Sequence, residues 1–174
     1  MAQKWGLDQV QTILDVGCGV GHWGQRLMRH LSPTTTLYGV DAEAAWVDGA
    51  RERAASLGLE ERAEFQVATA ESLPWPDESL DMVTCQTLLI HVADLRTAIR
   101  EMVRVLKPGG LFLAAEPNNF ASDAGGFIED PLPPWNVVSD LLELDYFSTR
   151  GKLAEGEGHQ SGGDLVMAGL RACG

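Results

Sequence analysis

The 174-residue sequence is poor in cysteine, in basic residues and in long apolar runs. Its three cysteines, Cys18, Cys85 and Cys173, lie far apart without a C-x-x-C pair, which favours a reduced, cytosolic compartment over a disulfide framework. No apolar run approaches the roughly 18 residues of a membrane-spanning helix. The first residues contain no apolar signal core and no small-residue cleavage site. We therefore expect a cytoplasmic protein with neither a membrane-spanning segment nor a secretory signal.

Basic residues are outnumbered, with 13 lysines and arginines against 25 aspartates and glutamates and a formal net charge of -12. A chain this acidic repels phosphate backbones, so nucleic acid is not an expected partner. The four histidines, His22, His30, His91 and His159, have no ligand spacing, so no metal site is expected. Hydrophobic residues make up 45% of the chain, which is typical of a globular protein. We expect residues 1–174 to form a single domain.

Short apolar runs alternate with helical patterns along the first two thirds of the chain. Strands are expected at residues 12–16, 36–40, 63–67, 82–85 and 111–115. Helices are expected with Trp23, Leu27 and Leu31 on one face, then over residues 44–57, and then from Asp94 as N-cap through Leu106. This alternation predicts an α/β fold with a doubly wound, mostly parallel sheet of strand order 3-2-1-4-5.

The pattern weakens after residue 117. A loop is expected over residues 118–134, a helix over 135–149, a polar glycine-rich stretch over 151–163 and a short helix over 165–173. The edge of the fifth strand is apolar on both faces, and such an edge associates unless something covers it. We expect either residues 118–149 or a second copy of the chain, forming a homodimer, to cover it.

The stretch from Asp15 to Gly21 reads Asp-Val-Gly-Cys-Gly-Val-Gly, follows the first predicted strand and opens a helix. Glycines allow a tight turn and the close approach of a ligand to the backbone, although a turn without a ligand is an alternative. The dinucleotide fingerprint G-x-G-x-x-G fails at its third glycine, where His22 stands. The loop also lacks the Lys-Ser/Thr ending of a P-loop, so it is not expected to bind phosphate.

The spacing D-x-G-x-G-x-G resembles the first motif of the class I S-adenosylmethionine-dependent methyltransferases. Residues 38–41, 68–83 and 104–110 resemble later motifs of that family, in the family's order. The resemblance covers roughly residues 12–117 and is nearest to the small-molecule subgroup often called methyltransferase type 11. It implies a Rossmann-like enzyme that binds S-adenosyl-L-methionine, methylates a small-molecule acceptor and releases S-adenosyl-L-homocysteine.

The resemblance also implies which residues bind the cofactor. They follow the first, second, third and fourth strands: Asp15, Gly17, Cys18, Gly19, Gly21, Asp41, Ala42, Thr69, Ala70 and Gln86. Asp41 would accept the ribose hydroxyls, with a helix N-cap as its alternative role. Asp15 lies in an apolar run and needs partners, either loop N–H groups or the cofactor's ammonium through water. The family often has Asp where Thr69 stands, so the Ala70 N–H is expected to do much of the adenine recognition.

Methyl transfer is an in-line displacement, and it needs a general base only when the acceptor atom is protonated. The catalytic candidates are His91 and Glu116, and His22 is a third residue near the expected site. A helix-entry role is the alternative for His91, and a loop anchor is the alternative for Glu116. Cys85 is not expected to act as a nucleophile, because buried cysteines usually only pack.

Two other functions stay open at this point. A nicotinamide-dependent oxidoreductase shares the sheet and the acid after the second strand, and a non-catalytic S-adenosylmethionine-binding module or fragment shares the site. We expect residues 12–117 to form the nucleotide-binding core and residues 118–174 the substrate side. The family's sixth and seventh strands have no apparent counterpart in the sequence, so we expect a C-terminally incomplete domain, with the ordered part of a longer protein or a five-strand variant as the alternatives.

Overall fold

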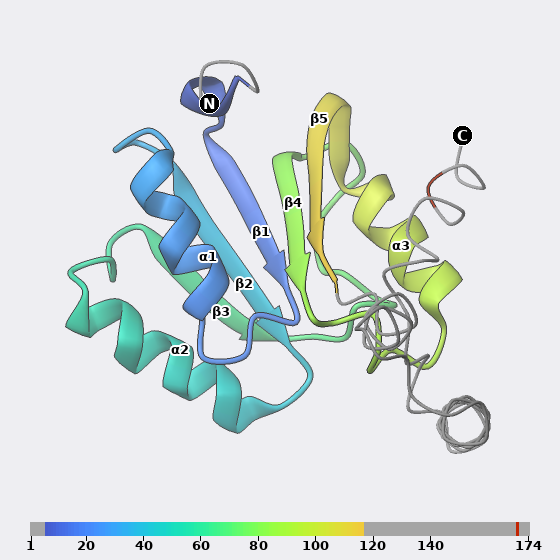
Figure 1. Cartoon of the computed structure of the whole chain (residues 1–174), viewed down its shortest axis with the longest axis horizontal. Coiled ribbons are helices and arrows are strands. Elements are labelled where there is room, and N and C mark those ends of the chain that lie inside the picture. Colours follow the sequence, from blue (N-terminus) through green and yellow to red (C-terminus); the bar gives the residue numbers. More distant parts are fainter. Residues whose placement is uncertain (1–5, 117–169, 171–174) are drawn as a thin grey trace, which may run out of the picture.

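The computed structural model describes residues 6–116 and Leu170, and Figure 1 shows one sheet with helices on both of its faces. The strands in this part are β1 (Thr12–Val16), β2 (Thr36–Asp41), β3 (Ala63–Val67), β4 (Leu80–Gln86) and β5 (Leu106–Ala115). The α-helices are α1 (His22–Leu27), α2 (Ala44–Ser56) and α3 (Leu95–Arg104). Two short 3-10 helices, η2 (Leu7–Gln9) and η3 (Met28–His30), complete the described elements.

The sheet confirms the predicted topology. Its five strands have the order β3-β2-β1-β4-β5, and every neighbouring pair is parallel. The carboxyl ends of the strands meet at one edge of the sheet (Figure 1). Because the chain moves outward from β1 to β3 and then returns to the other side of β1 for β4, a crevice opens beyond the ends of β1 and β4.

The hydrophobic core consists of two layers of side chains, one on each face of the sheet. Figure 1 places α1 and α2 on one face of the sheet and α3 on the other. Successive residues of a strand point to opposite faces, so Ile13 packs in the α1–α2 layer and Leu14 in the α3 layer. Both side chains are fully buried, as expected for a central strand covered on both faces.

The boundary between α3 and β5 differs from the prediction. The expected helix through Leu106 ends at Arg104, and the strand expected at residues 111–115 begins at Leu106. Leu80 pairs with Leu106 and Met82 pairs with Leu111, so the residues between them on β5 form an irregularity in the ladder. Gly109, within this irregularity, adopts a φ of +77°, a conformation that glycine tolerates. It allows the unpaired residues between Leu106 and Leu111 to bulge from the strand before pairing with β4 resumes.

The packing of α1 also differs from the prediction. Trp23, Leu27 and Leu31 are only partly buried, while Gly24 and Gln25 are the buried residues of the helix. A Cβ atom built on Gly24 would lie 2.7 Å from Oδ2 of Asp15 and 2.9 Å from Cδ1 of Leu37. The absence of a side chain at Gly24 therefore sets how closely α1 approaches the sheet.

The predictions for residues 118–134, 135–149, 151–163 and 165–173 fall outside the described residues, apart from Leu170, which packs against the α3 layer. Within the described part, β5 pairs with β4 alone, and the expected covering of its other edge stays a prediction. None of the helices among residues 6–116 is long and apolar enough to cross a membrane.

Replacing Gly24 with alanine should lower the free energy of unfolding by about 1–3 kcal/mol, because the new methyl group forces α1 away from Asp15 and Leu37. Urea unfolding followed by circular dichroism measures this change. Gly49→Ala in α2 is the matched control, because its Cβ would meet only the side chain of Val20, with Cγ1 nearest at 3.2 Å, and alanine favours a helix by about 0.5–1 kcal/mol. Equal destabilisation by the two variants would contradict the close approach at Gly24.

Candidate cofactor site

The glycine loop between β1 and α1 is built from left-handed backbone conformations. Gly17, Gly19 and Gly21 have φ angles of +68°, +50° and +75°, which other residues adopt only with strain. The Cys18 N–H donates to the Val40 carbonyl at 2.8 Å and so attaches the loop to β2. A Cβ atom on Gly19 would meet nothing within 4 Å. The loop therefore exposes its backbone to open space at Gly19.

Asp41 joins this loop to the start of α2. Its Oδ2 accepts a hydrogen bond from the Gly19 N–H at 2.9 Å, and its Oδ1 accepts one from the Glu43 N–H at 3.0 Å. The N-cap residue of α2 is Glu43, so the alternative role of Asp41 as N-cap does not hold. Each carboxylate oxygen has a second lone pair, which leaves Asp41 able to accept two further hydrogen bonds.

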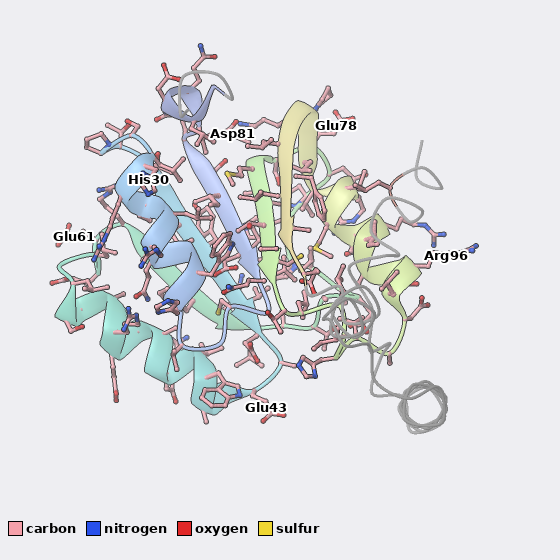
Figure 2. The ribbon with its side chains drawn as sticks, in the orientation of Figure 1. His30, Glu43, Glu61, Glu78, Asp81 and Arg96 are labelled. Atoms are coloured by element: carbon pink, nitrogen blue, oxygen red, sulfur yellow. The ribbon has the colours of Figure 1, made fainter. Side chains whose placement is uncertain are left out.

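Two adjoining cavities lie at this edge of the sheet, of about 440 Å³ and about 310 Å³. Glu43 of the first cavity lies at this end of the molecule, and Asp81 lies at the opposite end (Figure 2). The predicted cofactor residues of the first cavity are Gly17, Gly19, Asp41, Ala42, Thr69 and Ala70. Those of the second are Asp15, Gly17, Cys18, Gly19 and Gln86.

Gly21 is the predicted cofactor-binding residue that lines neither cavity. It is the N-cap residue of α1, and a Cβ atom on it would clash with Nε2 of Gln25. The glycine at this position therefore serves the turn into the helix. His22, which follows it, lines the second cavity.

The sequence reasoning missed several lining residues, above all Trp46, which borders both cavities. Trp46 lies in the first turn of α2 and is out of phase with the buried residues Val47, Ala50 and Ala54. That mismatch is a signal that the sequence does contain. Glu71 and Leu88 of the first cavity were missed because they lie in loops without periodicity.

Asp15 is the one buried carboxylate of the site. It is 1% exposed, and its Oδ2 accepts a hydrogen bond from the Gly24 N–H of α1 at 2.9 Å. Its Oδ1 has no hydrogen-bond partner among the described residues. Burial raises the pKa of Asp15 to about 7, and the nearby Asp41 charge adds to this rise. A buried, unpartnered carboxylate oxygen beside a cavity is costly, and a ligand would account for it.

A hydrogen-bonded chain fixes the wall of the second cavity. The Trp23 indole N–H donates to Oγ1 of Thr84 at 2.8 Å, and that hydroxyl donates to the Leu113 carbonyl at 2.7 Å. Thr84 lies on β4 directly beside Asp15 of β1. These two hydrogen bonds therefore connect α1, β4 and β5 and hold the partly buried indole of Trp23 against the second cavity.

Glu116 anchors the loop that follows β4. Its two carboxylate oxygens accept hydrogen bonds from the N–H groups of Leu88 and Leu89, both at 3.0 Å. The neighbouring Thr87 has a φ of +52°, a strained conformation for a β-branched residue. Glu116 lines neither cavity, so the geometry favours its alternative role as a loop anchor.

His91 is exposed and lines the first cavity. The N-cap of α3 is Asp94, whose Oδ1 accepts from the Thr97 N–H at 3.0 Å, so His91 does not cap that helix. Cys85 is buried, and burial together with the Glu116 carboxylate raises the pKa of its thiol above the usual range. A thiol held neutral in this way is a poor nucleophile. Among the described residues, no group of three His, Cys, Asp or Glu side chains could hold a metal ion.

The Asp15 carboxyl predicts an unusual dependence of stability on pH. Because its pKa is about 7 in the folded protein and 3.8 ordinarily, the folded state loses stability as the pH rises from about 4 to about 7. Asp15→Asn is neutral throughout, so its free energy of unfolding relative to the wild type should rise by about 2–3 kcal/mol from pH 5 to pH 8.

Urea unfolding at both pH values measures this difference. Asp94→Asn is the control, because hydrogen bonds from Thr97 lower the pKa of Asp94 and its effect should stay constant over that range. A pH-independent effect of Asp15→Asn would contradict the raised pKa.

Comparisons with known proteins agree with this geometry. Residues 7–149 match the family described as "Methyltransferase domain". The uncharacterized methyltransferase YcgJ of Bacillus subtilis is 40% identical over 104 residues, which are 60% of this chain and 40% of that protein. The ubiquinone/menaquinone biosynthesis C-methyltransferase UbiE of Pseudomonas syringae pv. syringae is 36% identical over 143 residues, covering 78% of this chain and 56% of UbiE.

Solved structures share the fold. The crystal structure of YcgJ has a TM-score of 0.61 at 24% identity and covers 98% of this chain and 81% of that one. The [4+2]-cyclase SpnF has a TM-score of 0.57 at 36% identity and covers 63% of this chain and 40% of that one. The chain thus spans about half the length, or less, of the curated relatives described above. With the family matched over most of its length, the chain belongs to the class I S-adenosylmethionine-dependent methyltransferases.

Proposed function

We propose that the protein transfers a methyl group from S-adenosylmethionine to a small-molecule acceptor. The observation that carries this proposal is the Asp41 carboxylate, which is bound to the Gly19 N–H beside two adjoining cavities. An acid at the end of the second strand of such a sheet is suited to accept hydrogen bonds from a ribose diol. Asp41 has two lone pairs left for that purpose.

The residues present fit this cofactor in both cavities. In the first cavity, Asp41 would hold the ribose, and Thr69 and Ala70 would face the adenine. Thr69 supplies one hydroxyl acceptor where an aspartate is common in the family. In the second cavity, Asp15 is a carboxylate suited to an ammonium group, and Cys18, Gln86 and the open backbone at Gly19 complete the wall. The family assignment also counts against the nicotinamide alternative.

The chain's own residues contribute mainly binding, alignment and the removal of water. When bound, S-adenosylmethionine supplies a methyl group on a sulfonium and leaves as a neutral thioether. His91, exposed at the wall of the first cavity, is the candidate to accept a proton from an acceptor that carries one at its nucleophilic atom. Glu116 has both oxygens engaged by Leu88 and Leu89, so we assign it to positioning the loop after β4.

A small-molecule acceptor is supported by the relatives, since UbiE is named as a C-methyltransferase of ubiquinone/menaquinone biosynthesis. We place the cofactor core at residues 12–117 and the substrate side at residues 118–174. The net charge of -12 disfavours a nucleic-acid substrate. Free Cys18 and Cys85 support a reduced, cytoplasmic location.

Two measurements on the full chain test the proposal. Isothermal titration should detect binding of S-adenosylmethionine and S-adenosylhomocysteine, with weaker binding of ATP and NAD. A panel of small metabolites should then include an acceptor that drives formation of S-adenosylhomocysteine. Binding without turnover on any acceptor would favour a non-catalytic module, or a reaction such as the cyclisation after which SpnF is named. Tighter binding of NAD or ATP would refute the cofactor assignment.

Asp41→Ala should weaken S-adenosylhomocysteine binding by about 1.5–3 kcal/mol, roughly 10-fold to 150-fold, because hydrogen bonds to a charged acceptor are lost. Isothermal titration measures the change in Kd. Asp48→Asn is the matched control, since Asp48 lies on α2, pairs with Arg51 and lines neither cavity. If Asp41→Ala binds as tightly as the control, Asp41 does not hold the ribose.

A further inference from the structure

Trp46 belongs to neither of the hydrophobic clusters that the described residues form. It is 52% exposed in the first turn of α2, whose buried residues are Val47, Ala50 and Ala54. Its indole N–H donates no hydrogen bond among the described residues, in contrast to the indole of Trp23, which donates to Thr84. Val20, which is 38% exposed, lies nearby, against Gly49 one helical turn further along α2. A large aromatic side chain that stays half exposed beside a cavity indicates a ligand contact, whereas an isolated apolar residue elsewhere on the surface does not.

The two cavities meet where Trp46 lies. Gly17, Gly19 and Trp46 line both cavities, and Trp46 alone among these three has a side chain. A ligand that extends from the first cavity into the second would therefore lie beside the residues that border both, and Trp46 is the one among them with a side chain. The backbone of the glycine loop borders the same passage.

On the proposed function, the charged part of the cofactor would occupy this passage. The ribose would lie at Asp41 of the first cavity, and the amino-acid end would lie near Asp15 of the second. The atoms between ribose and amino acid are the sulfur and its substituents. In S-adenosylmethionine this sulfur is a cationic sulfonium, and in S-adenosylhomocysteine it is a neutral thioether.

We propose that Trp46 recognises the sulfonium charge through a cation–π contact and so makes the site prefer S-adenosylmethionine over S-adenosylhomocysteine. This inference rests on the proposed function and assigns a specificity-determining residue to the same site. Tryptophan has the best aromatic face for a cation, and such contacts also recognise quaternary ammonium ligands. The carboxylates of Asp15 and Asp41 attract the cation as well, so the contribution of the indole must be separated from theirs.

A graded series of substitutions separates the two effects. Isothermal titration gives the Kd of both ligands for the wild type, Trp46→Phe and Trp46→Leu. The ratio of the S-adenosylhomocysteine Kd to the S-adenosylmethionine Kd should fall by about 3-fold to 10-fold in Trp46→Leu, with Trp46→Phe intermediate. The acidic groups are unchanged in this series, so their attraction for the cation stays constant.

Leu57→Ala is the matched control. Leu57 is an exposed apolar residue, 43% accessible, at the C-terminal end of the same helix, and it lines neither of the two cavities. The Kd ratio of this variant should equal that of the wild type. A change as large as that of Trp46→Leu would overturn the proposal.

Fluorescence gives a second, direct measurement. S-adenosylmethionine should quench the tryptophan emission of the wild type, and Trp46→Phe should show less quenching at saturating ligand, with Trp23 of the second cavity as the remaining source. Quenching as large in Trp46→Phe as in the wild type would overturn the proposal, as would a Kd ratio that is the same in the wild type and Trp46→Leu. If the wild type binds neither ligand, the proposed function itself fails. Normal binding with an unchanged ratio refutes only the role of Trp46.

Discussion

The hydrogen bond from the Gly19 N–H to the Asp41 carboxylate is the interaction on which the arrangement of the site depends. It joins the loop after β1 to the end of β2, and the second oxygen of Asp41 extends the link to the start of α2 at Glu43. Three glycines with positive φ angles make the loop tight enough to reach Asp41. One carboxylate therefore orients the glycine loop and the first turn of α2, which carries Trp46, around the two cavities.

The site contains a second carboxylate, Asp15, whose burial and hydrogen bonding differ from those of Asp41. Asp41 is partly exposed and accepts two backbone hydrogen bonds, whereas Asp15 is buried and one of its oxygens has no partner within the part of the chain that the structure describes. Burial of such a group destabilises the folded chain in the pH range where it is charged. Proteins tolerate destabilising groups at binding sites, where a ligand supplies the missing interaction. The geometry of Asp15 is consistent with a site that becomes complete when a cation enters the second cavity.

The described residues form the part of the chain that we propose binds the cofactor. They contain a strained turn at Thr87, held by the Glu116 carboxylate and by the hydrogen bond from the Thr87 N–H to the Ala115 carbonyl at 3.2 Å. That turn carries Leu88 along the wall of the first cavity, and a Cβ atom on Gly17 would lie 2.5 Å from Leu88 Cδ1. These hydrogen bonds fix the loop after β4 along the wall of the first cavity.

The sequence alone determined the strand order and predicted which residues gather beside the two cavities, because both depend on short motifs and on where the strands end. Apolar runs such as residues 12–16 mark the strands, and the loops at their carboxyl ends must meet at one edge of a parallel sheet. Gly17, Gly19, Asp41 and Thr69 could therefore be placed together without a structure. The start of β5 could not, since the irregularity between Leu106 and Leu111 depends on pairing with β4.

Only the tertiary structure decided the roles that depend on contacts between distant segments. Glu116 became a loop anchor because β5 ends beside the N–H groups of Leu88 and Leu89. Asp15 acquired its raised pKa because packing buries its carboxyl group, and the hydrogen bond from the Gly24 N–H offsets only part of that rise. Trp46 came to border both cavities because the α2 helix places it opposite the glycine loop. Burial and hydrogen-bond partners are properties of the packed chain, and no local pattern in the sequence specifies them.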